Sequence, residues 1–108
     1  MDTRELVDIL GRGEDSRHQF KEDVTSGDAL AAEIVAFSNS AGGRIFIGVR
    51  DDGTVAGLSA ADVARLNQLL SNTASQHVRP AVNPLTEIVA HADGRVMVVE
   101  VPPGVSKP

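Results

Sequence analysis

Four cations in the first half of the sequence carry the clearest chemical possibility. Arg17 and Lys21 lie in a charged segment, and Arg44 and Arg50 bracket the apolar run 45–49. If the charged segment forms a strand beside this run, the four cations fall along one edge of a sheet. Guanidinium and ammonium groups hold phosphate oxygens through charge-assisted hydrogen bonds that read no base sequence. The pattern therefore predicts a small nucleic-acid-binding stripe made by these four residues.

The same cations also allow a simpler interpretation. Acidic side chains are interleaved with them at Glu22, Asp23 and Asp51. Edge strands often carry mixed charges that keep them soluble and bind no ligand. The residues alone favour neither interpretation over the other.

The apolar run is the element that would position these cations. It is unbroken over residues 45–49, which predicts a central strand covered on both faces. Two glycines at 42–43 suit the end of a preceding helix, because glycine tolerates the left-handed backbone found there. An Asp-Gly pair at 52–53 predicts a hairpin turn with a return strand at 54–57.

Hydrophobic spacing predicts the remaining elements. Three helices are expected from apolar residues at helical spacing: Leu6, Ile9 and Leu10; Leu30, Ile34 and Phe37; and Val63, Leu66, Leu70 and Ala74, ending before Pro80. The charged segment 14–22 is expected to be an edge strand anchored by Phe20. Strands at 85–92 and 95–101 flank an Asp-Gly turn at 93–94. The result is an α+β fold with about three helices and a mixed sheet of about five strands.

The composition is that of one globular domain. Its 108 residues are 42% hydrophobic, which is enough for a single core. We expect this domain to span residues 1–101. Residues 102–108 are rich in proline and suit neither a strand nor a helix, so they are expected to begin a linker to a C-terminal region outside this chain.

Composition also argues against several classes of function. The chain has no Cys, which excludes disulfides and thiolate metal sites. It has no signal-like start or membrane-length apolar segment, so we expect a cytoplasmic protein without membrane contact. Three Phe with no Trp or Tyr weigh against a base-stacking platform. A net charge of −5 confines any nucleic-acid contact to a local patch, and without a P-loop motif no nucleotide cofactor is expected.

Two glycine-containing blocks carry a family resemblance. The first is Ala-Phe-x-Asn-x-x-Gly-Gly at 36–43, and the second is Gly-Val-x-Asp-Asp-Gly-x-Val-x-Gly at 48–57. With them, nearly the whole chain resembles the AlbA_2 family, also called the Schlafen AlbA_2 domain. The resemblance implies a DNA-binding domain at the N-terminus of bacterial transcriptional regulators and helicase-like proteins, some labelled divergent AAA-4. It also implies kinship with Schlafen proteins that bind tRNA-like substrates, some of which cleave them with a metal.

The resemblance also implies where such a metal would bind. Acidic residues hold it in the cleaving Schlafen proteins, and the matching positions here are Glu14, Gln19 and Asp51, with Asp52 as neighbour. Gln19 departs from the acidic pattern, and a neutral amide is a weaker ligand for Mg²⁺ or Mn²⁺. Arg50 also stands where many members are acidic. These departures weaken the expectation of metal-dependent cleavage.

Three functions follow for comparison with the structure. The first, which we expect, is a nucleic-acid module for DNA, with no catalytic residue or metal, in a larger regulator or helicase-like protein. The second is a metal-dependent nuclease built on Glu14, Asp51 and Asp52; the simpler view of these carboxylates is that they are solvated surface groups. The third is a protein-interaction or homo-oligomerisation domain, suggested by the net acidity and the apolar strands.

Overall fold

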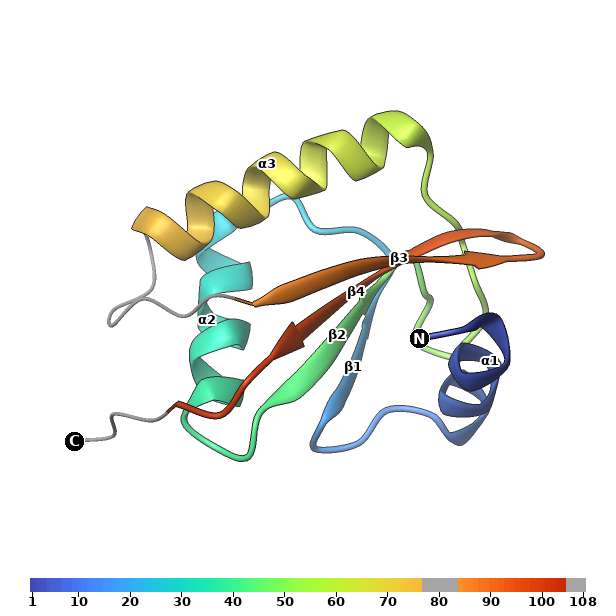
Figure 1. Ribbon diagram of the computed structural model, residues 1–108, viewed down its shortest axis with the longest axis horizontal. Coiled ribbons are helices and arrows are strands. Elements are labelled where there is room, and N and C mark those ends of the chain that lie inside the picture. Colours follow the sequence, from blue (N-terminus) through green and yellow to red (C-terminus); the bar gives the residue numbers. More distant parts are fainter. Residues whose placement is uncertain (77–83, 105–108) are drawn as a thin grey trace.

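A computed structural model describes residues 1–76 and 84–104. In chain order these form α1 (Thr3–Arg12), β1 (His18–Lys21), α2 (Gly27–Ser38), β2 (Gly43–Ile47), α3 (Ala60–Gln76), β3 (Leu85–His91) and β4 (Gly94–Val101) (Figure 1). The expected end of the third helix before Pro80 lies outside the described residues, as does the end of the expected linker, 105–108. No helix in the described part is long and apolar enough to cross a membrane.

The strands form one mixed sheet in the order β1-β2-β4-β3. β1 runs parallel to β2, whereas β4 is antiparallel to both β2 and β3. The predicted α+β class and mixed sheet are therefore confirmed. The apolar run is central, as expected, because β2 lies between β1 and β4 and Ile45, Phe46 and Ile47 are fully buried.

The expected return strand at 54–57 is wrong, so the described sheet has four strands. This segment touches the chain before the turn through one isolated bridge, between Val49 and Val55. The N–H groups of Ala56 and Gly57 both donate to the carbonyl of Gly48. Two donors that converge on one carbonyl cannot continue a ladder, in which each residue needs its own partner.

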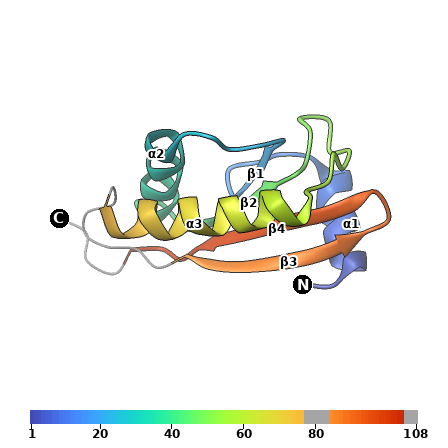
Figure 2. The same cartoon turned by 90° about the horizontal axis from the view of Figure 1, so that it is seen from above.

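Helices cover both faces of the sheet (Figure 2). α2 and α3 pack on the face that carries Ile45 and Ile47, and α1 packs on the face that carries Phe46. Near the start of β2, four residues lie side by side across the strands on the α1 face: His18, Arg44, Glu100 and Leu85. Their side chains stay partly or largely exposed, so this end of the sheet, called the open end below, is accessible to solvent.

Local sequence explains where the helices begin and where α2 ends. Asp2 and Ser26 cap α1 and α2 by accepting from backbone N–H groups three residues later, as N-cap residues do. After α2, Gly42 has a φ of +83° and donates its N–H to the carbonyl of Phe37. Of the two glycines expected at this helix end, Gly42 takes the left-handed role, and Gly43 begins β2.

The turn between β3 and β4 differs by one residue from the prediction. It lies at Ala92 and Asp93, and Gly94 already belongs to β4. The reason is the strand register, because His91 pairs with Gly94 and leaves a loop of two residues. Glycine at 94 is instead needed for packing, since a Cβ there would lie 2.6 Å from the Cα of Gly57.

Gly43 gives a test of how tightly α2 packs at the start of β2. A Cβ at this position would lie 2.3 Å from ring atoms of Phe37, so Gly43→Ala is expected to lower the free energy of unfolding by about 2 kcal/mol through overpacking. Gly11→Ala is the control, since a Cβ there meets no atom within 4 Å and the helical site should gain about 0.5 kcal/mol. Urea unfolding measures both, and equal stability of the two variants would contradict the packing described.

Candidate nucleic-acid interface

Parallel pairing of β1 with β2 brings two of the four predicted cations together. The backbone N–H of Arg44 donates to the carbonyl of Arg17 at 2.8 Å, and His18 lies opposite Arg44 in the register. The three residues line one surface pocket at the open end of the sheet. Its other walls are the turn 41–43 and the end of β4 with the prolines that follow, 100–103.

The guanidinium groups of Arg17 and Arg44 differ in their surroundings. Arg44 Nε donates to Glu100 Oε1 at 3.2 Å, with the two side chains 33% and 49% exposed. Such a solvated pair is weak and is screened by salt, and it uses one of the five guanidinium N–H groups. Arg17 is exposed and forms no ion pair within the part of the chain that the structure describes. Both cations therefore keep donors that can reach an anion.

Asp15 fixes the loop that presents Arg17. Its Oδ1 accepts from the backbone N–H of Arg17 at 2.8 Å and lies 2.8 Å from His18 Nδ1. These bonds, the first above all, lower the pKa of Asp15 below its ordinary value. The His18 ring also stacks on Phe46, with ring centroids 6.0 Å apart. The loop is thus held from two sides, but Asp15 places a negative charge near the pocket.

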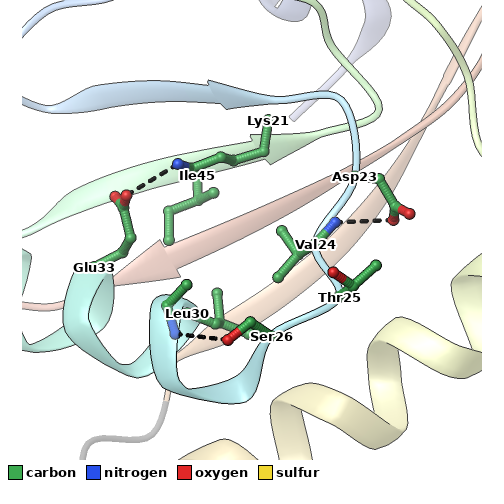
Figure 3. Close-up of a pocket in the computed structure, with 9 residues that line it drawn as sticks. Lys21, Asp23, Val24, Thr25, Ser26, Leu30, Glu33 and Ile45 are labelled. Carbon is green, nitrogen blue, oxygen red and sulfur yellow. Dashed lines mark hydrogen bonds and ion pairs between the residues drawn. The ribbon is translucent and has the colours of Figure 1, made fainter.

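Lys21 lies on the opposite face of the sheet. It pairs with Ile47 in the register, so its side chain is on the α2 side. There its Nζ is 3.0 Å from Glu33 Oε1, at the rim of a small pocket with an apolar floor of Val24, Leu30 and Ile45 (Figure 3). The ammonium is already paired and points away from Arg44.

Arg50 occupies a third place, in the turn that follows β2. Its Nη1 is 3.4 Å from both Thr54 Oγ1 and the carbonyl oxygen of Val55. The side chain thus braces the turn against itself. The four cations therefore do not form one stripe: Arg17 and Arg44 share a pocket, and Lys21 and Arg50 lie elsewhere.

The carboxylates of the nuclease alternative have separate partners. Glu14 Oε2 accepts from the backbone N–H of Phe20 at 2.9 Å. Asp52 Oδ1 accepts from the Thr54 hydroxyl at 2.6 Å and from its N–H at 2.9 Å, and both bonds lower the pKa of Asp52. Asp51 is exposed. Across residues 1–76 and 84–104, no three His, Asp or Glu side chains are grouped so that they could hold a metal ion.

Two parts of the pocket were not predicted from the sequence. Pro102 and Pro103 form a wall, although their composition indicated a linker. They are held in place because the N–H of Gly104 donates to the carbonyl of Ser38 at 2.7 Å. One signal could have placed them there: they directly follow Val101, the last residue of β4, which pairs with Gly43 of β2.

Gln19, where the family resemblance implies an acidic residue, faces the α2 side beside Ile45. Its Oε1 is buried and has no hydrogen-bond partner among the described residues. A buried acceptor left unpaired is destabilising. The site is therefore unfavourable for an amide, and more so for a carboxylate, whose charge is harder to bury.

Replacing Gln19 tests this burial. Gln19→Met keeps an unbranched side chain and removes the unpaired oxygen, so the free energy of unfolding is expected to rise by about 1 kcal/mol. Gln19→Glu, the matched acidic variant, is expected to be less stable than the wild type near neutral pH and to recover as the pH falls, because burial raises a carboxyl pKa. Urea unfolding at two pH values measures both effects. A Glu variant as stable as the wild type at neutral pH would show that the position is solvated.

Comparison with known protein families identifies the domain. A family model described as "Schlafen, AlbA_2" matches residues 14–108. The chain belongs to the Schlafen AlbA_2 family. The match includes the blocks at 36–43 and 48–57, so the resemblance seen in the sequence is confirmed. The family match begins after α1 and includes all four strands.

A solved structure has a similar fold. It is the solution structure of the N-terminal domain of a protein from Nitrosomonas europaea, described as ATP-dependent DNA helicase RecG-related. The two match with a TM-score of 0.61 over 95% of this chain and 74% of that chain, at 23% sequence identity. At this identity the likeness concerns the fold. No curated protein gives a significant match to the chain.

Proposed function

We propose that this domain binds nucleic acid, with DNA as the first ligand to test, through phosphate contacts at Arg17 and Arg44. The observation that carries the proposal is the shared pocket of these two cations at the open end of the sheet. Guanidinium groups match phosphate oxygens in geometry and charge. Two of them at one pocket can hold one phosphate or two neighbouring phosphates of a strand.

The pocket walls support close approach of a nucleic-acid backbone. The turn that forms one wall consists only of small residues, Ala41, Gly42 and Gly43, so little side-chain bulk surrounds the pocket there. Pro102 and Pro103 supply a flat apolar wall, against which a sugar can pack. With no aromatic side chain lining the pocket, apart from His18, base stacking is limited and the contacts favour the backbone.

The charge balance supports weak binding that depends strongly on salt. The chain carries a net charge of −5, and Glu100 and Asp15 lie close to the two cations. Phosphate contacts gain affinity from released counterions, so such binding falls as salt rises. We propose that the domain, residues 1–101 with a linker from 102 onward, acts as a module of a larger regulator or helicase-related protein that adds further contacts. The helicase-related name of the structural neighbour supports this context.

Anisotropy of a labelled DNA duplex tests the proposal at about 50 mM and about 200 mM salt. Arg17→Gln and Arg44→Gln are each expected to weaken binding severalfold and to reduce the slope of log K against log salt by about one. Arg12→Gln is the matched control, because Arg12 is exposed on α1 and pairs with Asp8. It removes the same charge and should leave the local phosphate contact intact.

The same titration distinguishes the predicted cations. Lys21→Gln and Arg50→Gln are expected to behave like the Arg12 control, because Lys21 already pairs with Glu33 and Arg50 braces its own turn. The proposal fails if the wild type does not bind at low salt, or if the variant that lacks both Arg17 and Arg44 binds as well as the wild type. Repeating the titration with an RNA hairpin shows which nucleic acid is preferred.

A further inference from the structure

The two edge strands of the sheet, β1 and β3, differ in how far their outward backbone groups are hydrogen-bonded. At the β1 edge, the chain before the strand folds back, and Asp15 and His18 exchange backbone hydrogen bonds of 3.1 and 3.4 Å. The outward N–H of Phe20 is taken by Glu14 Oε2 at 2.9 Å. Covering an edge in this way prevents it from pairing with another chain.

The β3 edge is covered at one end only. Thr3 Oγ1 donates to the carbonyl oxygen of Ala90 at 2.6 Å, which shows that this carbonyl points away from β4. Backbone groups in an antiparallel ladder alternate in direction, so those of Thr86 and Ile88 point the same way as those of Ala90. Thr86 and Ile88 have no hydrogen bond on this outer side within residues 1–76 and 84–104. Within the described residues, the strand thus presents two N–H and two C=O groups without a partner.

Apolar side chains border this free edge. Leu85 is 68% exposed and Ile88 is 41% exposed; the other large exposed apolar residue among the described ones is Val7 on α1. Leu85 lies on the α1 face and Ile88 on the opposite face. A free ladder flanked on both faces by exposed apolar side chains is the pattern that strand pairing would bury.

We propose that the β3 edge pairs with the β3 edge of a second copy of this chain, antiparallel about a two-fold axis at Glu87. Thr86 of each copy then lies opposite Ile88 of the other, and the exposed N–H and C=O groups form four hydrogen bonds. The two four-stranded sheets become one continuous sheet of eight strands. A two-fold interface uses the same patch on both copies. This edge meets that requirement, because the outward N–H and C=O groups of one copy face the outward C=O and N–H groups of the other.

The ends of the proposed ladder fit the same register. Ala90 lies opposite Pro84 of the second copy, and proline has no N–H to donate. The Ala90 carbonyl does not need that donor, because it already accepts from Thr3. Leu85 lies opposite Val89 of the second copy, on the α1 face of the sheet. Glu87 meets its own copy at the axis, where each carboxylate is already paired with the N-terminal ammonium of its own chain, so the repulsion between the two carboxylates is reduced.

Light scattering coupled to size-exclusion chromatography at rising protein concentration tests the dimer. The wild type is expected to move from the monomer mass of 11.3 kDa toward twice that value. Ile88→Lys is expected to remain monomeric, because a lysine at an exposed edge opposes pairing. Val7→Lys is the matched control and should dimerise as the wild type does. Circular dichroism verifies that both variants are folded.

Cysteine crosslinking tests the register, since the chain contains no Cys. Directly opposed residues in a non-hydrogen-bonded antiparallel pair have Cβ atoms about 4.5–5.5 Å apart, near disulfide reach. Glu87→Cys is expected to form disulfide-linked dimers on mild oxidation, and Val7→Cys is not. A wild type that stays monomeric, an Ile88→Lys variant that still dimerises, or a Glu87→Cys variant that does not crosslink would each overturn the proposal.

Discussion

The parallel pairing of β1 with β2 is the constraint on which the rest of the structure depends. β1 has only four residues, yet its register decides which face each of its side chains occupies. His18 and Phe20 fall on the α1 face, and Gln19 and Lys21 fall on the α2 face. Because a shift by one residue would exchange the two sets, this short pairing decides that Phe20 enters the core and that Lys21 lies on the face opposite Arg44. Phe20, buried against Phe46 edge to face, is the anchor that holds the register.

Much of the fold could be predicted because its signals are local. The apolar run at 45–49, the capping residues and the glycine after α2 each determine the backbone structure of only a few neighbouring residues, so a short stretch of sequence is enough to recognise them. The return strand at 54–57 could not be predicted, because the convergence of two N–H groups on Gly48 depends on three-dimensional backbone geometry. The candidate site was predicted in its residue types only. Which face Lys21 occupies depends on the parallel register, and that information is spread over two segments more than twenty residues apart in the sequence.

Two acidic side chains lie beside the two cations of the pocket. Arg44 shares its guanidinium with Glu100, and Asp15 fixes the loop that holds Arg17. Removing either acid would raise the positive potential, but the loss of Asp15 would also free the loop. An acidic protein can therefore present a cationic pocket without becoming basic over its whole surface, at the cost of a weaker attraction for phosphate. In the proposed function, long-range attraction contributes little, so phosphate binding would depend on short-range contact.

The way in which the chain leaves β4 has a mechanical consequence. The Gly104 N–H is bonded to the carbonyl of Ser38, and Pro103 packs so closely on Gly42 that a Cβ there would lie 3.0 Å from it. The exit path is thus fastened to the end of α2 while it forms one wall of the pocket. A tension applied along the chain beyond residue 104 would act first on this wall. The direction in which the chain leaves the domain and the shape of this pocket wall are therefore linked by the same contacts.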